Sequence, residues 1–291
     1  MSEIRGIIPA LITPYTADGR INEDSLEKII SLNMKKGVSG FYVCGSTAEA
    51  FLLSLEERKR VLEVVTSCVD GKASVIAHIG CISTDEAIEL GMHAEKAGAD
   101  AVSSIPPFYY KFSPEEIRGH YRKIADKVSL PIILYNFPAA TGCSLTGADS
   151  RDLLADPHVI GVKHTSYNLY ELERMKQLNN ELIVLNGHDE VYLGGLAMGA
   201  DGAIGSTYNF MAEKFIMMNQ HFGNGELQAA QKLQSEANNI IDVLVEVGLL
   251  AGIKYILGLQ GIECGHCRSP FKRLPDTGKA KLDEVLKLNL A

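Results

Sequence analysis

One segment, 74–107, contains a complete strand–helix–strand unit and reads SVIAHIG-CISTDEAIELGMHAEKAGAD-AVSSIPP. Its outer parts, 74–80 and 101–107, are short apolar runs without acidic residues, lysine or arginine. The part between them, Thr84–Ala97, has apolar residues at helical spacing, and Gly98 then supplies a typical helix end. Continuously apolar runs of this kind predict parallel strands covered on both faces, with a helix as the right-handed crossover.

The same kind of apolar run recurs along the first two-thirds of the chain. The eight runs are 6–14, 40–45, 74–80, 101–107, 131–136, 159–164, 182–187 and 202–206. Their starts lie between residues 6 and 202, which gives seven intervals with a mean of 28 residues. Segments of helical period lie between them, at 23–36, 54–69, 84–97 and 113–128. Eight such units predict an α/β protein with a closed (β/α)₈ TIM barrel.

A doubly wound open sheet is the alternative fold. It is disfavoured because no G-x-G-x-x-G motif follows the first run, where Pro9-Ala10-Leu11-Ile12-Thr13-Pro14 stands instead. After the eighth unit, 226–247 and 249–259 predict further helices. No linker or low-complexity tract divides the chain. We therefore expect a barrel over 1–222 and a C-terminal helical extension of the same domain over 223–291.

Composition excludes several classes of function. The chain of 291 residues is 46% hydrophobic and 22% charged, as in an ordinary globular protein, and its net charge is −8. This charge argues against nucleic acid or an anionic membrane as the main partner. The most apolar long stretch, 242–262, contains Glu246, Lys254 and four glycines, so no membrane span is expected. The N-terminus lacks the pattern of a signal peptide, which predicts a cytoplasmic protein.

The six cysteines are expected to be free thiols. Cys264-Gly265-His266-Cys267 is similar to a thiol–disulfide redox motif, but it follows an apolar helical run where such a motif requires a strand. A structural zinc site needs four ligands, and no second pair of cysteine or histidine residues stands at ligand spacing. We therefore expect an incidental loop at this position, without a metal.

Lys163 is the most informative single residue. It ends the otherwise uncharged strand Val159–Val162, on the side of a barrel where active sites lie. Burying an ammonium group there is costly unless the group is paired or neutralised. One interpretation is an ion pair with Asp189 or Glu190, one strand away. The other is a desolvated lysine whose free amine attacks a carbonyl group.

Other strand ends carry polar groups that suit the second interpretation. Tyr135 ends the preceding strand, about 4.8 Å away, where its phenol either packs or relays a proton. Gly45-Ser46-Thr47 opens a helix whose N–H groups suit a substrate carboxylate, and Ser46-x-x-Glu49 also fits a capping box. Asp189 and Glu190 are either helix N-terminal acids or hydrogen-bond acceptors for a polyol.

Five motifs carry a resemblance to a known family. They are Gly45-Ser46-Thr47-Ala48-Glu49, Tyr135-Asn136-x-Pro138, Gly161-Val162-Lys163-x-Thr165-Ser166, Asn186-Gly187-x-Asp189-Glu190 and Gly205-Ser206-Thr207-Tyr208-Asn209. In this order they resemble the dihydrodipicolinate synthase / N-acetylneuraminate lyase family of pyruvate-dependent class I aldolases, and within it the N-acetylneuraminate lyase branch. The likeness spans essentially the whole chain.

The resemblance implies reversible cleavage of N-acetylneuraminate to N-acetylmannosamine and pyruvate, without a metal or organic cofactor, by a homotetramer. Lys163 would form a Schiff base with the pyruvate portion, and Tyr135 would move the proton of the sugar hydroxyl. Tyr109 matches a tyrosine that this superfamily can project into a neighbouring subunit's site. The implied ligand contacts are Ser46 and Thr47 with the pyruvate carboxylate, Gly205 near the imine, and Thr165, Gly187, Asp189, Glu190 and Ser206 with the sugar chain.

Four alternatives remain open at this stage. Dihydrodipicolinate synthases resemble the chain too, but they carry an arginine shortly after the Tyr-Asn-x-Pro motif, where this chain has Ala139-Ala140-Thr141-Gly142. An aldolase for another 2-keto-3-deoxy sugar acid would use the same lysine. The third alternative is a catalytically silent barrel that binds a ligand. The fourth is a thiol oxidoreductase that uses Cys264 and Cys267. His188 stands where the family often has an aromatic or other residue, so fine specificity is not predicted.

Overall fold

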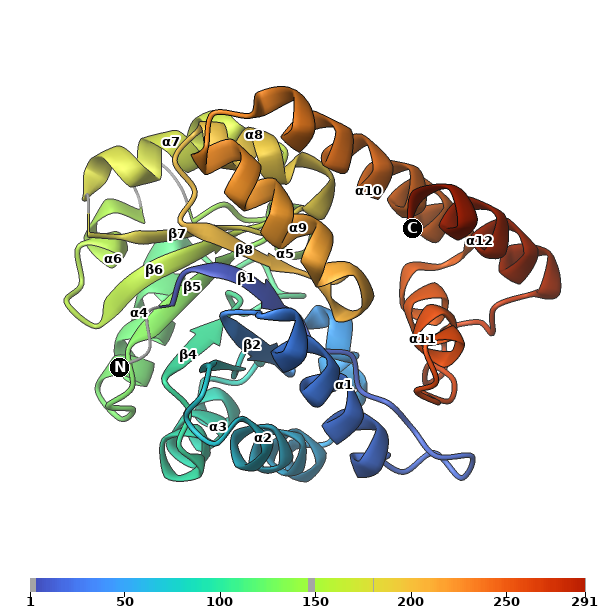
Figure 1. Ribbon diagram of the computed structural model, residues 1–291. Coiled ribbons are helices and arrows are strands. Elements are labelled where there is room, and N and C mark those ends of the chain that lie inside the picture. Colours follow the sequence, from blue (N-terminus) through green and yellow to red (C-terminus); the bar gives the residue numbers. More distant parts are fainter. Residues whose placement is uncertain (1–3, 146–149, 180, 291) are drawn as a thin grey trace.

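The computed structural model describes residues 4–145, 150–179 and 181–290, and its centre is a ring of eight parallel strands (Figure 1). Each strand pairs with the next in the order β1-β8-β7-β6-β5-β4-β3-β2. A parallel bridge between Ala10 and Tyr42 joins the two ends, with the Leu11 amide donating to the Tyr42 carbonyl at 3.0 Å. The TIM-barrel prediction is confirmed. The strands are β1 Gly6–Pro9, β2 Gly40–Val43, β3 Ser74–His78, β4 Ala101–Ser104, β5 Ile132–Asn136, β6 Val159–His164, β7 Ile183–Asn186 and β8 Gly202–Gly205.

Helices surround the ring and begin where local sequence predicts. Ser54 and Ser113 form capping boxes with Glu57 and Glu116, and Pro114 opens its helix. The helices of the barrel are α1 Glu23–Lys36, α2 Leu55–Val69, α3 Thr84–Ala97, α4 Pro114–Ala125, α5 Pro138–Thr141, α6 Arg151–Leu154, α7 Leu169–Leu178, α8 Tyr192–Ala197 and α9 Tyr208–Gly223. Short 3₁₀ turns follow β2 and β7, namely η1 Ser46–Ala48, η2 Ala50–Leu52 and η4 Asp189–Val191.

The C-terminal extension consists of α10 Leu227–Val247, α11 Leu249–Leu259 and α12 Asp276–Asn289. In Figure 1 it is drawn in orange to red, beside the barrel. The predicted helices over 226–247 and 249–259 are confirmed, whereas α12 has no counterpart in the sequence prediction. The division of the chain at residues 222 and 223 stays a prediction. Among the described residues, no helix combines the length and apolarity required to cross a bilayer.

Two buried cores result from the alternation of side chains along the strands. The larger lies between strands and helices. The smaller fills the ring and includes Ile8, Tyr42, Ile76, Tyr135 and Ile204. The barrel interior is therefore packed with apolar and aromatic side chains, and Tyr135 lies directly opposite Lys163 in the register of β5 and β6.

The amino-terminal side of the barrel is fixed by Asp201, the residue before β8. Its carboxylate accepts hydrogen bonds from the Val184 amide at 2.8 Å and from Lys176 Nζ at 2.6 Å, and it forms an ion pair with Arg5. Its carbonyl accepts from the Gly6 amide at 3.0 Å. One buried carboxylate thus links β7, β8 and β1.

We predict that Asp201→Ala lowers the free energy of unfolding by roughly 2–4 kcal/mol, because it leaves the buried Val184 amide without its acceptor and removes the carboxylate that Lys176 and Arg5 share. Urea unfolding measures this change. Lys72→Ala, at an exposed ion pair with Asp70, is the control and should change stability by less than about 0.5 kcal/mol. Equal effects of the two substitutions would contradict the assignment.

Candidate active site

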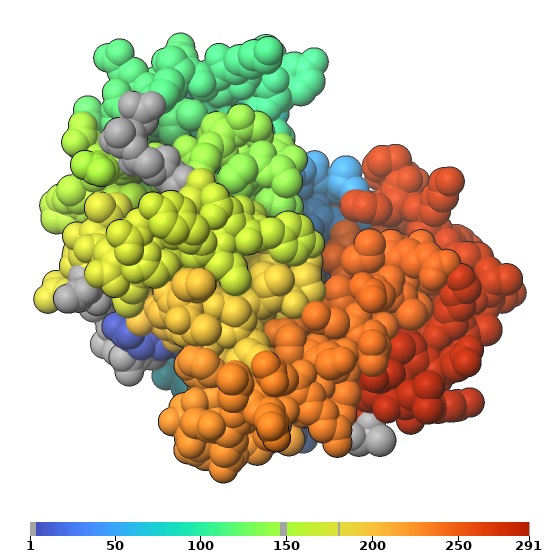
Figure 2. Space-filling view, turned by 90° about the horizontal axis from the view of Figure 1, so that it is seen from above, coloured from blue at the N-terminus to red at the C-terminus, as the bar shows by residue number. Residues whose placement is uncertain are grey.

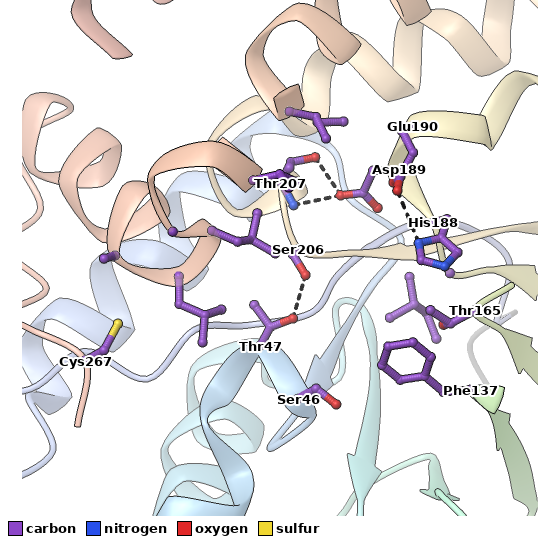
Figure 3. A pocket seen from close by; sticks show the side chains of 18 of the residues that line it. Ser46, Thr47, Phe137, Thr165, His188, Asp189, Glu190, Ser206, Thr207 and Cys267 are labelled. Carbon is purple, nitrogen blue, oxygen red and sulfur yellow. Dashed lines mark hydrogen bonds and ion pairs between the residues drawn. The ribbon is translucent and has the colours of Figure 1, made fainter. Parts of the chain in front are cut away.

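A cavity of about 730 Å³ opens at the carboxyl ends of the strands (Figure 3). One wall consists of barrel residues at or after the carboxyl ends of β2, β5, β6, β7 and β8. The opposite wall comes from α10, α11 and the segment after α11. Nine predicted site residues line the cavity, namely Ser46, Thr47, Tyr135, Lys163, Thr165, Gly187, Asp189, Glu190 and Ser206.

Lys163 projects from β6 into the bottom of this cavity and is buried. Its Nζ lies 4.1 Å from the centroid of the Tyr135 ring and 4.3 Å from that of Tyr42. Within residues 4–145, 150–179 and 181–290, no carboxylate forms an ion pair with it. The ion-pair interpretation with Asp189 or Glu190 is therefore wrong. The amine has aromatic neighbours instead of a counter-ion.

The groups around the amine are themselves uncharged. Burial raises the pKa of Tyr42 well above its usual value, and the Tyr42 hydroxyl donates to Ser103 Oγ at 3.1 Å. Burial also lowers the pKa of His78 far below its usual value, and Nδ1 of this ring donates to the Cys44 carbonyl at 2.9 Å. Both rings lie about 6 Å from the ring of Tyr135. A neutral aromatic shell thus encloses the end of Lys163.

The turn after β2 differs from the predicted capping box. Ser46–Ala48 is a single 3₁₀ turn, and Glu49 ends it in the left-handed conformation at φ 59°. Thr47 Oγ1 lies 2.6 Å from Ser206 Oγ, so hydroxyls that follow β2 and β8, the two strands that flank β1, meet at the cavity (Figure 3). Because the first N–H groups of a helical turn lack partners within it, this turn suits a carboxylate, as the sequence predicts.

Asp189 is buried and joins the ends of β7 and β8. Its Oδ2 accepts from the Thr207 amide at 2.9 Å and from the Thr207 hydroxyl at 2.7 Å (Figure 3). A Cβ on Gly205 would lie 2.0 Å from Asp189 Oδ1, so only glycine leaves room for this carboxylate. Burial raises the pKa of Asp189 to about 6, although the Thr207 hydrogen bonds oppose this rise. Gly205 itself lies behind the cavity wall.

Glu190 faces the cavity from the next position. Its Oε1 accepts from the Tyr167 hydroxyl at 2.5 Å and lies 3.3 Å from His188 Nδ1. Burial favours a higher pKa for Glu190, but the hydrogen bonds from His188 and Tyr167 outweigh it and lower the pKa to about 2. The His188 ring stacks on the Tyr167 ring, with 4.3 Å between the ring centroids. Two side chains of the protein thus fix one carboxylate oxygen of Glu190, and the residue lines the cavity.

Thr165 and Gly187 are in contact at the ends of β6 and β7. A Cβ on Gly187 would lie 1.9 Å from Thr165 Oγ1. This hydroxyl is buried and has no hydrogen-bond partner within the described part of the chain. A buried hydroxyl without a hydrogen-bond partner is costly, which indicates that a ligand or a water molecule hydrogen bonds to it.

Of the predicted site residues, Gly205 and Tyr109 do not line the cavity, and Tyr109 lies away from it on the surface. Its side chain is 84% exposed, and its ring contacts the ring of Tyr110. Its φ of 78° is unusual for a residue other than glycine. A role in a neighbouring subunit therefore stays a prediction.

The cysteine motif after α11 does not form a reactive thiol pair. Cys264 is buried, and burial raises the pKa of its thiol to about 12. Burial also raises the pKa of Cys267 to about 11. Redox activity requires a thiolate, so these thiols have the character of structural residues.

Sequence reasoning missed the aromatic shell and the contribution of the extension to the cavity. The missed cavity residues include Phe137, Tyr167, Thr207, Val245, Leu249 and Cys267. Tyr167 and Thr207 stand inside quoted motifs or directly after them, so their position was a usable signal. The residues of α10 and α11 carry no chemical signal of this kind, because only the path of the extension brings them to the cavity.

The barrel, the buried lysine at the end of β6 and the hydroxyl-rich rim together define a lysine-dependent class of (β/α)₈ barrel. The model of the Dihydrodipicolinate synthetase family matches residues 3–289, and the chain belongs to this family.

Individual relatives give a finer comparison. An N-acetylneuraminate lyase of Rhizobium meliloti (strain 1021) is 42% identical over 284 residues, which cover 98% of this chain and 95% of the relative. A structure of CdNal from Clostridium difficile in complex with mannosamine has a TM-score of 0.95 at 35% identity and 99% coverage of both chains. A catalytic lysine mutant of Ruminococcus gnavus sialic acid aldolase has a TM-score of 0.95 at 33% identity, with coverage of 100% of this chain and 98% of the other.

The buried Asp189 carboxyl predicts a pH dependence of stability. Its pKa is about 6 in the folded protein, above the ordinary value of 3.8 that applies to the unfolded chain. The folded state therefore binds the proton more tightly than the unfolded state does. The contribution of Asp189 to the free energy of unfolding is therefore full below about pH 4 and falls by roughly 3 kcal/mol as the pH rises through 6. Urea unfolding of the wild type and of Asp189→Asn at about pH 4 and pH 7 measures this difference.

Glu190→Gln is the matched control. The pKa of Glu190 is lowered to about 2, so its contribution is present above about pH 4.5 and is lost only as the pH falls toward 2. The difference between wild type and Glu190→Gln should therefore change little between pH 5 and 7. A difference between wild type and Asp189→Asn that is independent of pH would contradict the assignment.

Proposed function

We propose that the protein is a class I, Schiff-base aldolase that cleaves N-acetylneuraminate reversibly to N-acetylmannosamine and pyruvate. The observation that carries the proposal is the buried Lys163 amine between two tyrosine rings, without a carboxylate partner among the described residues. Family membership and the lyases and sialic acid aldolases among its relatives support the same reaction.

The amine of Lys163 attacks the C2 ketone of the open-chain sugar acid, and loss of water gives an imine. Tyr135, one strand away, gives its phenol proton to the departing water, and the resulting phenolate takes the proton of the C4 hydroxyl. The C3–C4 bond then breaks, its electron pair moves into the protonated imine, and the aldehyde of N-acetylmannosamine is released. Protonation of the resulting enamine at C3 and hydrolysis of the imine give pyruvate and the free lysine.

The proposed contacts follow from the positions of the cavity residues. Ser46 and Thr47 bind the pyruvate carboxylate, and Gly205 acts near the imine only indirectly, by leaving room for the Asp189 carboxylate. The remaining predicted residues, Thr165, Gly187, Asp189, Glu190 and Ser206, surround the sugar chain. The Glu190 carboxylate is the natural acceptor of a sugar hydroxyl, because it lines the cavity and Tyr167 and His188 both contact the same oxygen, Oε1.

The assembly and the location of the protein are part of the proposal. Tyr109 and its neighbour Tyr110 are exposed aromatic side chains, which suits a contact with another copy of the chain. We therefore propose a homotetramer in which Tyr109 reaches a neighbouring site, and a cytoplasmic enzyme that acts on small molecules without a metal or organic cofactor.

Dihydrodipicolinate synthesis is the second candidate because the family is named for it. The segment after β5 disfavours it, since 139–142 contains no cationic side chain to bind a second carboxylate. The experiment is to compare turnover of N-acetylneuraminate with condensation of pyruvate and aspartate semialdehyde, and with cleavage of other 2-keto-3-deoxy sugar acids. We expect N-acetylneuraminate to have the highest kcat/KM, and turnover of aspartate semialdehyde alone would refute the proposal.

Removal of the Tyr135 hydroxyl tests the proton-transfer step separately. We predict that Tyr135→Phe lowers kcat for N-acetylneuraminate by about 100-fold or more, because general acid–base catalysis contributes about 10²–10⁴. Thermal unfolding should change little, since the ring remains packed against Phe137 and Tyr42. A folded Tyr135→Phe variant with full kcat would exclude the phenol from the mechanism.

A further inference from the structure

A buried ion pair connects the turn after β2 to the C-terminal extension. Glu49 directly follows η1, and its Oε1 lies 2.7 Å from Nζ of Lys254, which belongs to α11. The two side chains are 0% and 2% exposed. Placing two opposite charges in such a site costs desolvation energy that their attraction barely repays, so stability alone does not explain the pair.

The segment after α11 encloses the same carboxylate. Glu49 Oε2 accepts from the backbone amide of Arg268 at 2.7 Å, and Lys254 Nζ lies 3.4 Å from the His266 carbonyl. Cys267, between His266 and Arg268, lines the active-site cavity (Figure 3). Lys254 further lies 4.2 Å from the centroid of the Tyr15 ring. Both carboxylate oxygens of Glu49 thus accept hydrogen bonds from residues of the extension.

The side chain of Arg268 fixes the outer end of this contact. Its guanidinium donates to the Leu52 carbonyl at 2.7 Å and forms an ion pair with Glu57, and it lies 4.7 Å from the centroid of the Tyr15 ring. Leu52 is the last residue of η2, three positions after Glu49. The extension therefore contacts the chain at both ends of η2, at Glu49 before it and at Leu52, its last residue.

The backbone conformation of Glu49 links these contacts to the cavity. Glu49 has φ 59° and ψ 35°, a left-handed conformation that a residue with a Cβ adopts only at a cost. Its amide donates to the Ser46 carbonyl at 3.1 Å and so closes the 3₁₀ turn. Because the side chain is fixed by Lys254 and Arg268, the conformation that closes the turn is fixed as well.

We propose that Glu49 and Lys254 are positioning residues that hold the Ser46–Ala48 turn in the shape that binds the substrate carboxylate. This inference rests on the proposed function, in which Ser46 and Thr47 bind the carboxylate of pyruvate. The C-terminal extension thereby controls the affinity of the barrel for the ketoacid, across 205 positions of sequence.

The test is the double variant Glu49→Gln with Lys254→Met, which removes both charges and leaves no single buried charge behind. The readout is the rate at which borohydride inactivates the enzyme, measured across pyruvate concentrations. We expect the half-saturating pyruvate concentration to rise about tenfold or more, with a limiting rate within about threefold of wild type, because a displacement of about 1 Å in a positioned group can cost about 100-fold.

The matched control is Lys214→Met with Glu236→Gln, which removes a part-buried ion pair between α9 and α10. It should lower thermal stability without a change in the half-saturating concentration. If the double variant at Glu49 and Lys254 does not fold, Arg268→Ala takes its place, with an expected rise of roughly threefold.

An unchanged half-saturating concentration in a folded variant would overturn the positioning role. Wild-type protein that borohydride does not inactivate at any pyruvate concentration would instead refute the proposed function.

Discussion

The amine of Lys163 lies between the rings of Tyr42 and Tyr135, and the rest of the site depends on keeping carboxylates away from it. Two acids, Asp189 and Glu190, stand on the neighbouring strand end, where either one would capture an ammonium group. Each is bound elsewhere, Asp189 by Thr207 and Glu190 by Tyr167 and His188. No acid in the described cavity therefore competes with a carbonyl substrate for the amine.

Closure of the barrel supplies the second requirement. Tyr42 comes from β2 and Tyr135 from β5, so the two rings meet at Lys163 only because the eight strands form a ring. Cation–π contacts contribute about 0.5–2 kcal/mol each and cannot replace a counter-ion, but they exclude water and fix the direction of the side chain. The same closure brings Thr47 and Ser206 within 2.6 Å of each other from strands far apart in the sequence.

The strand–helix period and the strand ends were sufficient to predict the barrel and most of the cavity residues. Strand β6 matches its predicted run, Val159–His164, because its apolar residues all pack against barrel or helices. The first run was predicted to extend to Pro14, but β1 ends at Pro9 because pairing with β8 stops at Gly205.

Other features depend on contacts between distant parts of the chain. The contact of Glu49 with Lys254 spans 205 positions, and the local pattern Ser46-x-x-Glu49 pointed to a capping box that does not form. The cavity wall formed by α10 and α11 had no local signature for the same reason.

The extension is therefore part of the site. In Figure 2 it forms a continuous mass, orange to red, beside the yellow and green parts of the barrel. It supplies one wall of the cavity through α10 and α11, and it holds the turn after β2 through Lys254 and Arg268. A barrel of this kind uses its strands to place the reacting groups and its appended helices to adjust the shape around them.

The most direct measurement of the central claim is a crystal structure of the protein soaked with pyruvate. The account predicts continuous electron density between Lys163 Nζ and C2 of the ketoacid, with the carboxylate on the Ser46–Ala48 turn. Density for pyruvate bound without a covalent link, or bound to a different lysine, would contradict it.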